Sequence, residues 1–369
     1  MRVLIAPDCF GGTLTAPEAA AAIAAGWRAA APADELTLCP LADGGPGFVE
    51  VLASALGGHL HHRSVAGPLG ASVDAVWLEH DGTAYLECAQ ACGLTLVPKE
   101  ERRALVANTV GVGELVAHAI ESKVHTIVVG LGGSGSTDGG AGMFRALGAV
   151  PVDEHDEPLP HGGGPLIDTA RLSGKVNLGD VKLIAASDVE NPLLGKLGAA
   201  RVFGPQKGAD DLAVRRLERS LTRWADVLAE VAGRDIRDEQ GAGAAGGLGA
   251  ALIALGATVE SGAGVVRRLT GLDTALDDAQ LVVTGEGSFD FQSLRGKLVT
   301  RVAGAAAERG TPCLVLAGQV SVGRRRAASA GVDQAYSVSE HVGSPEASLA
   351  DPAGTLTALA KHVSAQWRL

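Results

Sequence analysis

The sequence has few aromatic residues, few lysines and an excess of negative charge. Only 3% of its 369 residues are aromatic, so base-stacking surfaces for single-stranded nucleic acid are scarce. The formal net charge of −11 at pH 7 argues against nucleic acid, and against an anionic membrane, as a partner. Any phosphate group must therefore be bound by a local arrangement of residues.

Cysteine is also sparse, and its placement excludes two common uses. The five cysteines are scattered, odd in number and without metal-ligand pairing, so a disulfide framework is not expected. The apolar run near the N-terminus is broken by Pro7 and Asp8 and is too short for a secretion signal. These features predict a protein of the reducing cytoplasm.

One long stretch, 241–259, carries no charged residue. Six of its nineteen residues are glycine, and Glu260 follows directly. This composition predicts a buried helix of glycine and alanine; the alternative, a membrane span, needs about 20 apolar residues. We therefore expect no membrane partner.

Units of strand, loop and helix recur along the chain, which predicts an α/β fold with mostly parallel sheets covered by helices. Thr15 and Glu18 have the spacing of a capping box at the start of the first helix. Strands are expected at 3–6, 35–39, 126–130, 181–186, 281–284, 313–317 and 334–338, and helices at 14–31, 46–56, 139–147, 205–240 and 297–309.

The pattern changes between residues 60 and 96. Asp81-Gly82 lies between two stretches of strand-forming residues and is typical of a hairpin turn. A second, mixed domain is expected to begin there. Segment 151–175 is rich in proline, glycine and acidic residues and predicts an exposed loop.

Acidic residues occur in glycine-rich loops just after the expected strands, where open α/β sheets bind their ligands. There are five such loops, at 7–13, 42–45, 132–140, 187–192 and 284–290. A carboxylate at this place can hold Mg²⁺ or accept a proton, and glycine lets backbone N–H groups approach anionic oxygens. The five loops together favour phosphoryl transfer, although each one alone also fits an ordinary turn.

Several better-known site patterns are absent or weak. The chain has no GxxxxGK[ST] motif, and the GxGxxG match at Gly241 follows a polar segment, so it indicates close helix packing instead of dinucleotide binding. The histidines at 59, 61 and 62 lack nearby cysteine or acidic ligands and are interpreted as surface residues.

Two of the eight lysines, Lys207 and Lys297, lie beside glycines and are candidates for binding phosphate oxygens. A solvated loop lysine is the alternative for each. A covalent nucleophile is not expected, because Cys9 follows an aspartate and Ser134 lacks the GxSxG spacing.

Together, the loops resemble the type I glycerate kinases, which phosphorylate D-glycerate with Mg-ATP. The resemblance runs along almost the whole chain. Its motifs are Ala6-Pro-Asp8 with Phe10 and Gly12-Thr-Leu-Thr15, Pro40-Leu-Ala-Asp-Gly-Gly45, Gly132-Gly-Ser134, Asp138-Gly-Gly-Ala-Gly142, Asp188-Val-Glu-Asn-Pro192, Gly204-Pro-Gln-Lys-Gly208, Gly241-Ala-Gly-Ala-Ala-Gly-Gly247 and Thr284-Gly-Glu-Gly287 with Asp290, Gln292 and Gly296-Lys297.

The resemblance implies two α/β domains. A flavodoxin-like domain with a mostly parallel sheet would be built from residues 1–64 and 275–369. A second mixed α/β domain, 65–274, would be inserted in the middle of the chain, with the active site in the cleft between the two.

The resemblance also implies an activity, the transfer of the γ-phosphoryl of ATP to D-glycerate to give 2-phosphoglycerate with Mg²⁺ as cofactor. Asp188 is expected as general base, with Asp43 as the next candidate and Lys297 as a further catalytic residue. Glu286 and Asp290 are expected to bind the metal. The expected substrate- and nucleotide-binding residues are Asp8, Gly132, Gly133, Ser134, Asp138, Asn191, Lys207, Glu286 and Gln292.

The chain departs from the family pattern near the expected site. Gly11 and Pro46 stand where the family commonly has lysine and glutamate, Thr137 where it has asparagine, and Ser288 where it often has arginine. Two alternatives are therefore kept: a kinase for another small hydroxy acid or polyol, and a non-catalytic protein that binds a phosphorylated acid. The assembly state is open and includes a homo-oligomer.

Overall fold

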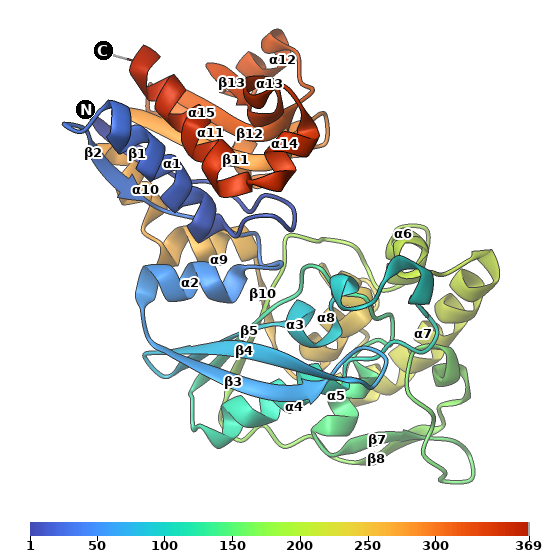
Figure 1. Ribbon diagram of the computed structural model, residues 1–369. Coiled ribbons are helices and arrows are strands. Elements are labelled where there is room, and N and C mark those ends of the chain that lie inside the picture. Colours follow the sequence, from blue (N-terminus) through green and yellow to red (C-terminus); the bar gives the residue numbers. More distant parts are fainter. Residues whose placement is uncertain (368–369) are drawn as a thin grey trace. The chain divides into compact units, whose positions relative to one another are not determined.

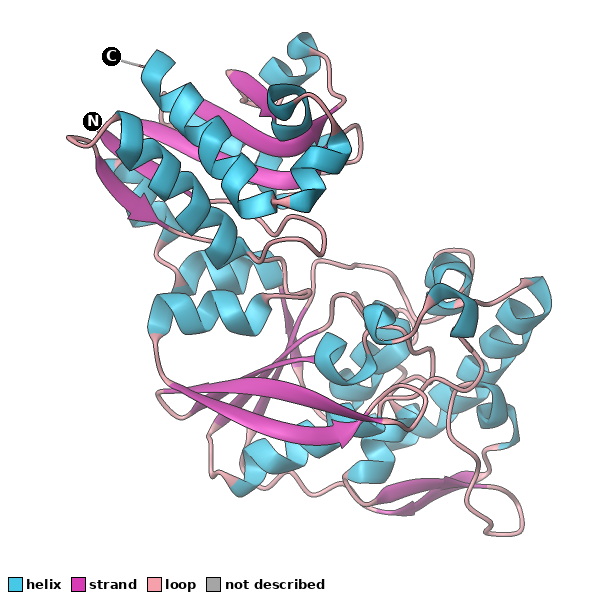
Figure 2. Cartoon of the chain, in the orientation of Figure 1, coloured by secondary structure: helices cyan, strands magenta, loops and turns pink. Residues whose placement is uncertain are grey.

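A computed structural model describes residues 1–367, and the chain divides into two compact units. Unit 1 consists of Met1–Ala42, Glu50–Leu56 and the chain from Val266 on; unit 2 consists of Asp43–Val49 and Gly57–Val265. Unit 1 is α/β with a parallel sheet and unit 2 is mixed α/β, which confirms the predicted fold class (Figure 1 and Figure 2). Relative to the expected domain boundaries, residues 43–49 and 57–64 fall in unit 2 and residues 266–274 fall in unit 1.

Unit 1 is built on a five-stranded parallel sheet. Its strands are β1 (Arg2–Ile5), β2 (Glu35–Leu38), β11 (Leu281–Phe289), β12 (Cys313–Val320) and β13 (Gln334–Ser337). Their order, β13-β12-β11-β1-β2, is the flavodoxin-like order, in which the first strand lies between the second and the third. The order reverses at β1 and β11, so their carboxyl ends form the expected ligand edge.

Helices α1 (Ala16–Ala30) and α15 (Pro352–Gln366) pack side by side on unit 1 (Figure 1). Thr15 caps α1 and forms the predicted capping box with Glu18. A Cβ at Gly26 would lie 2.1 Å from the Thr357 carbonyl oxygen, so only glycine permits this packing. The remaining helices of unit 1 are α10 (Leu272–Asp278), η5 (Ser293–Arg295), α11 (Leu298–Glu308), α12 (Arg324–Ser329), α13 (Val338–Val342) and α14 (Pro345–Ala350).

Unit 2 is built on a six-stranded sheet in the order β10-β9-β6-β5-β4-β3. Its strands are β3 (His59–Ala66), β4 (Ser72–His80), β5 (Thr83–Glu87), β6 (Thr126–Gly130), β9 (Lys182–Ala186) and β10 (Thr258–Glu260). The strands β5, β6, β9 and β10 are parallel, and β3 and β4 are antiparallel to their neighbours. The hairpin predicted at Asp81-Gly82 joins β4 to β5, and both residues have positive φ, 47° and 68°.

The glycine and alanine stretch forms α8 (Ala244–Ala254), in which every residue is buried. The predicted buried helix is confirmed in part, because residues 245–247 have left-handed dihedral angles and interrupt its first turn, and the end of the stretch enters β10. Among the described residues, no helix combines the length and the apolarity needed to cross a bilayer. The other helices of unit 2 are α3 (Cys88–Cys92), η1 (Leu94–Leu96), η2 (Lys99–Glu101), α4 (Val110–Glu121), α5 (Ala141–Ala146), η3 (Gly164–Asp168), α6 (Ala199–Phe203), η4 (Pro205–Lys207) and α7 (Asp211–Ala232). Two helices straddle unit boundaries, α2 (Phe48–Leu56) and α9 (Gly262–Leu269).

The prediction of a plain loop over 151–175 is wrong. Strands β7 (Ala149–Val152) and β8 (Arg171–Gly174) pair antiparallel as a separate two-stranded sheet (Figure 2). The strands are only four residues long, and Pro151 interrupts the apolar pattern of the first one, so the alternation was too short to be read from sequence.

The three clustered histidines lie on the edge strand β3. His61 stacks on Trp77 with ring centroids 3.9 Å apart, and its Nε2 lies 2.7 Å from the Glu79 carboxylate. Within residues 1–367, no group of three or more His, Cys, Asp or Glu side chains is placed to hold a metal ion.

Candidate active site

In unit 1, the loop after β1 lies against the last part of strand β11 at the ligand edge. The Asp8 N–H donates to the Gly285 carbonyl at 2.8 Å, and the Asp8 carboxylate accepts from the Cys9 N–H at 2.7 Å. A Cβ at Gly287 would lie 3.3 Å from the backbone nitrogen of Gly11. This close approach places Asp8 beside the segment that carries Glu286.

Glu286 is the most unusual carboxylate of this edge, because it is only 5% exposed and its Oε1 has no hydrogen-bond partner among the described residues. Lys297 Nζ lies 3.6 Å from its other oxygen, Oε2. Burial raises the pKa of Glu286, although the Ser293 side chain and the Lys297 ammonium oppose the rise. A buried carboxylate oxygen without a partner is suited to a ligand or cation that arrives from outside.

Asp290 follows β11 directly and organises the next turn. Its Oδ1 accepts from the N–H groups of Gln292 and Ser293 at 2.7 and 3.2 Å. Desolvation tends to raise the pKa of Asp290, but the two N–H donors hold it below its ordinary value, so Asp290 is ionised at neutral pH. Two carboxylates can hold Mg²⁺ together with the oxygens of a bound ligand, so a metal site at Glu286 and Asp290 stays a prediction.

In unit 2, three glycine-rich loops meet at the carboxyl ends of β6 and β9. The Gly132 N–H donates to the Gly44 carbonyl at 3.1 Å, and the Leu131 N–H donates to the Ala186 carbonyl at 3.0 Å. A Cβ at Gly132 would lie 2.3 Å from the Gly45 Cα, so the backbones touch. Asp43 is exposed beside them, and its Oδ1 accepts from the Gly45 N–H at 3.1 Å.

Asp188 lies at the same edge, two residues after β9. Ser261 donates its hydroxyl to Asp188 Oδ1 at 2.5 Å, and the Ala263 N–H donates to Oδ2 at 3.2 Å. These donors fix the carboxylate at the start of α9. Sequence reasoning missed Ser261, although its position between β10 and α9 matches that of the other loops at this edge.

Asp138, predicted as a binding residue, lies inside unit 2 with no exposed surface. Its Oδ2 accepts from the Thr109 N–H, the Thr109 hydroxyl and the Gly142 N–H at 2.9, 2.9 and 3.0 Å, and its Oδ1 accepts from the Gly140 N–H at 3.2 Å. Burial raises the pKa of Asp138, and the four donors counteract the rise. The side chain fastens the loop that follows Ser134 to the start of α4.

Lys207 is also inside unit 2, where it is only 2% exposed. Its Nζ donates to the Ser134 hydroxyl oxygen at 2.9 Å and to the Ser136 carbonyl at 2.5 Å. Ser134 is itself 7% exposed, so the lysine supports this glycine-rich loop from within. Because Lys207 donates to Ser134 Oγ, the serine's own hydrogen is available to another acceptor.

The buried Lys207 makes stability depend on pH in a defined direction. Burial lowers its pKa to about 8, whereas in the unfolded chain the group keeps its proton to about pH 10.4. Between these values the unfolded state binds more protons, so the free energy of unfolding should rise with pH by on the order of 3 kcal/mol. Denaturant titrations from pH 7 to 10.5 should show the free energy of unfolding rising more for the wild type than for K207M. If the difference between the two proteins stays constant over this range, Lys207 is not buried as an ammonium group with a lowered pKa.

The side-chain amide of Asn191 donates to the Leu197 carbonyl at 2.7 Å, and the backbone carbonyl of Asn191 accepts from the Gly243 N–H at 2.9 Å. This predicted binding residue therefore ties the loop after Asp188 to the segment before α8. Its side chain holds the turn 191–197, in the same unit as Asp43 and Asp188.

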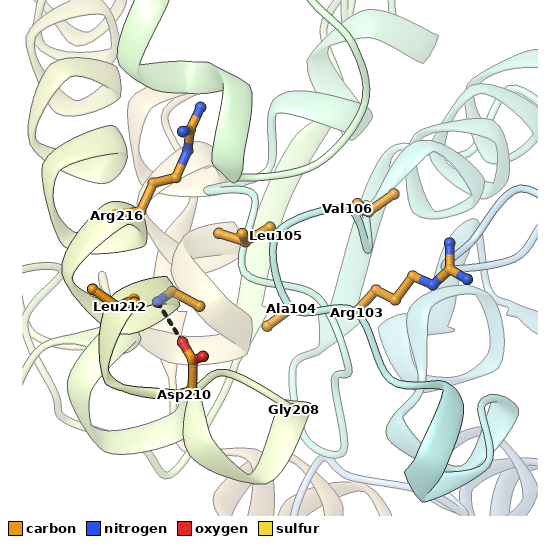
Figure 3. Close-up of a pocket in the computed structure, with 9 residues that line it drawn as sticks. Arg103, Ala104, Leu105, Val106, Gly208, Asp210, Leu212 and Arg216 are labelled. Atoms are coloured by element: carbon orange, nitrogen blue, oxygen red, sulfur yellow. Dashed lines mark hydrogen bonds between the residues drawn. The ribbon is translucent and has the colours of Figure 1, made fainter.

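The pocket in Figure 3, of about 450 Å³, lies in unit 2 between segment 103–106 and the first turn of α7, and Gly208 also lines it. Arg103 and Arg216 lie at its two sides, and their guanidinium groups do not meet (Figure 3). Asp210 is occupied, since it accepts from the Ala213 N–H at 2.8 Å and caps α7. None of the predicted site residues lines this pocket, and its two arginines do not converge.

The chain is similar to known proteins along nearly its whole length. Residues 3–368 match the model of the glycerate kinase family. An uncharacterized protein of Mycobacterium tuberculosis is 50% identical, with 99% of this chain and 91% of that protein covered. Glycerate 2-kinase of Escherichia coli is 41% identical, with 93% of this chain and 92% of that protein covered.

A similar structure is also known. It belongs to a protein of Salmonella typhimurium LT2, assigned provisionally as glycerate kinase 2; the TM-score is 0.84 and the identity 39%, with 99% of this chain and 98% of that chain covered. Glycerate kinase of Halalkalibacterium halodurans is 43% identical, with 91% of this chain and 90% of that protein covered. Sequence, fold and the acidic, glycine-rich sheet edges thus agree, and the chain belongs to the glycerate kinase family.

Proposed function

We propose that this protein transfers the γ-phosphoryl group of ATP to D-glycerate and forms 2-phosphoglycerate. The observation that carries the proposal is the buried carboxylate of Glu286. Its Oε1 has no hydrogen-bond partner among residues 1–367, and the Lys297 ammonium lies 3.6 Å from its Oε2. Such a pair suits the phosphate chain of a metal-bound nucleotide, since one group takes the cation and the other the phosphate oxygens. The relative named glycerate 2-kinase supports the choice of acceptor and product.

The acceptor is bound by unit 2. Asp188 takes the proton of the attacking hydroxyl as it forms its bond to phosphorus, and the two donors on its carboxylate keep it oriented. Gly132, Gly133 and Ser134 donate hydrogen bonds to the glycerate carboxylate, and the serine can do so because Lys207 occupies its oxygen. Asp43 is the second candidate for the base.

The nucleotide is bound by unit 1. Glu286 and Asp290 hold Mg²⁺, which when bound neutralises charge on the phosphate oxygens. Lys297 pairs with the phosphate chain, and Asp8 and Gln292 border it. With these roles, catalysis consists of positioning the reactants and neutralising charge, as expected for phosphoryl transfer. We expect the reaction to take place in the cytoplasm.

A coupled assay of ADP release tests this function. ADP should appear only with both D-glycerate and Mg²⁺, and EDTA should stop the reaction. Phosphorus NMR of the product should show the phosphate on the second carbon. ADP release that is the same with and without D-glycerate would contradict the proposal.

A panel of acceptors separates the two alternatives. Gly11 and Pro46, which replace a lysine and a glutamate of the family pattern, favour including other small hydroxy acids and polyols. A higher kcat/KM for one of these than for D-glycerate would identify a different kinase. Tight binding of 2-phosphoglycerate without turnover of any acceptor would instead identify a binding protein.

A further inference from the structure

Unit 1 carries a basic surface with an exposed aromatic ring at its centre. We call it the arginine surface and define it as Phe291, Arg295, Arg324, Arg325 and Arg326. Phe291 is 54% exposed, which is unusual for phenylalanine in a chain with only six of them. The guanidinium carbons of Arg295 and Arg326 lie 5.1 and 5.5 Å from its ring centroid.

The sheet brings the two halves of this surface together. Strands β11 and β12 are parallel neighbours, Phe289 is in register with Val320, and the Ser321 N–H donates to the Phe289 carbonyl at 3.0 Å. The segments that follow the two strands, 290–297 and 321–326, therefore leave the sheet side by side at its carboxyl edge. Open α/β sheets bind ligands at this edge, and Glu286 lies on the same strand as Phe289.

The charge of the surface is opposite to that of the whole chain. Segments 291–301 and 320–330 each contain three Lys or Arg residues and no Asp or Glu, whereas the net charge of the protein is −11. Among residues 1–367, no acidic side chain forms an ion pair with any arginine of the surface. Like charges held together without a counter-charge favour an anionic ligand.

We propose that the arginine surface binds the nucleoside triphosphate, with the purine ring stacked on Phe291 or on an adjoining guanidinium plane and with the arginines facing the phosphates. Stacking on an aromatic ring and on arginine is a common way to hold a base, and guanidinium groups pair readily with phosphate. A pocket of about 300 Å³, to which Arg326 also contributes, adjoins the surface between η5, α11 and α12. The proposal rests on the proposed function, because it specifies where that reaction's phosphoryl donor binds.

Calorimetric titration of the full-length protein with AMP-PNP and Mg²⁺ tests the proposal. F291A should weaken binding about 10-fold through lost base stacking, and it should leave the inhibition constant of inorganic tripolyphosphate unchanged. R326Q should weaken the binding of both probes. The KM for D-glycerate should not change in either variant.

Two variants of the same unit serve as matched controls. L349A removes an equally exposed apolar side chain on α14, and R28Q removes an exposed arginine of α1. If F291A and R326Q bind AMP-PNP as tightly as these controls, the arginine surface is not the nucleotide site, even if the wild type phosphorylates D-glycerate. If AMP-PNP binding weakens as expected but the wild type releases no ADP with D-glycerate, the surface is supported and the proposed function is overturned.

Discussion

Replacing Asp188 by asparagine should lower kcat for glycerate phosphorylation by about 10²–10⁴-fold, which is the usual contribution of a general base. Asparagine keeps the size of the side chain, its oxygen can accept from the Ala263 N–H, and its amide can donate to the Ser261 hydroxyl oxygen, so both contacts can persist. It cannot take the proton of the hydroxyl. The dissociation constant of AMP-PNP should stay near the wild-type value, because the nucleotide is assigned to unit 1.

Asp180 provides a matched control for this substitution. It is exposed and lies just before β9, at the opposite end of the strand that leads to Asp188, so D180N should have full activity. S261A should reduce kcat about 10-fold, since it removes one of the two donors that orient the carboxylate. Undiminished turnover by D188N would exclude Asp188 as the base and leave Asp43 as the candidate.

Replacing Asp138 by alanine should destabilise unit 2 by about 3–5 kcal/mol. The substitution leaves the donors at Thr109, Gly140 and Gly142 inside the protein without an acceptor, and it opens a cavity where the carboxylate was. Urea unfolding followed by hydrogen exchange, read separately for peptides of each unit, measures the loss. Faster exchange is expected in α4 and α5 and not in the sheet of unit 1.

Ser136 offers a matched control in the same loop. Its hydroxyl is fully buried and has no hydrogen-bond partner in the described part of the chain, so S136A should be neutral or slightly stabilising. T109V removes one of the four donors and also the oxygen that accepts from the Met143 N–H at 3.0 Å, so it should cost about 2 kcal/mol. Equal stabilities of D138A and S136A would show that the Asp138 network does not support unit 2.

The sequence predicted where most of the acidic, glycine-rich loops lie, because the prediction depends only on which residues directly follow a strand. A carboxylate that follows a buried strand lies at the carboxyl edge wherever that strand enters the sheet, which holds for Asp8, Asp188 and Asp290 alike. Glu286 is different, because the predicted loop at 284–290 is strand as far as Phe289 and Glu286 lies within β11. The capping box and the hairpin turn were predictable for the same reason. Each depends on residues no more than a few positions apart.

What could not be predicted depends on contacts between distant residues. Lys207 has the sequence surroundings of an exposed loop lysine, and only the packing of η4 beneath Ser134 and Ser136 buries it. Ser261 is 73 positions from Asp188, so no local pattern connects the two. Arg326 of α12 likewise becomes a neighbour of Phe291 only through the pairing of β11 with β12.

The chain passes from one unit to the other four times, after Ala42, Val49, Leu56 and Val265. In consequence, during synthesis on the ribosome β1 must wait for β11, its sheet neighbour, until more than two thirds of the protein has emerged. Unit 2 has no such delay, since its last residue, Val265, precedes β11. We therefore expect the inserted unit to complete its fold first on the growing chain, while the earliest strand depends on chaperones to keep its apolar surface from aggregating.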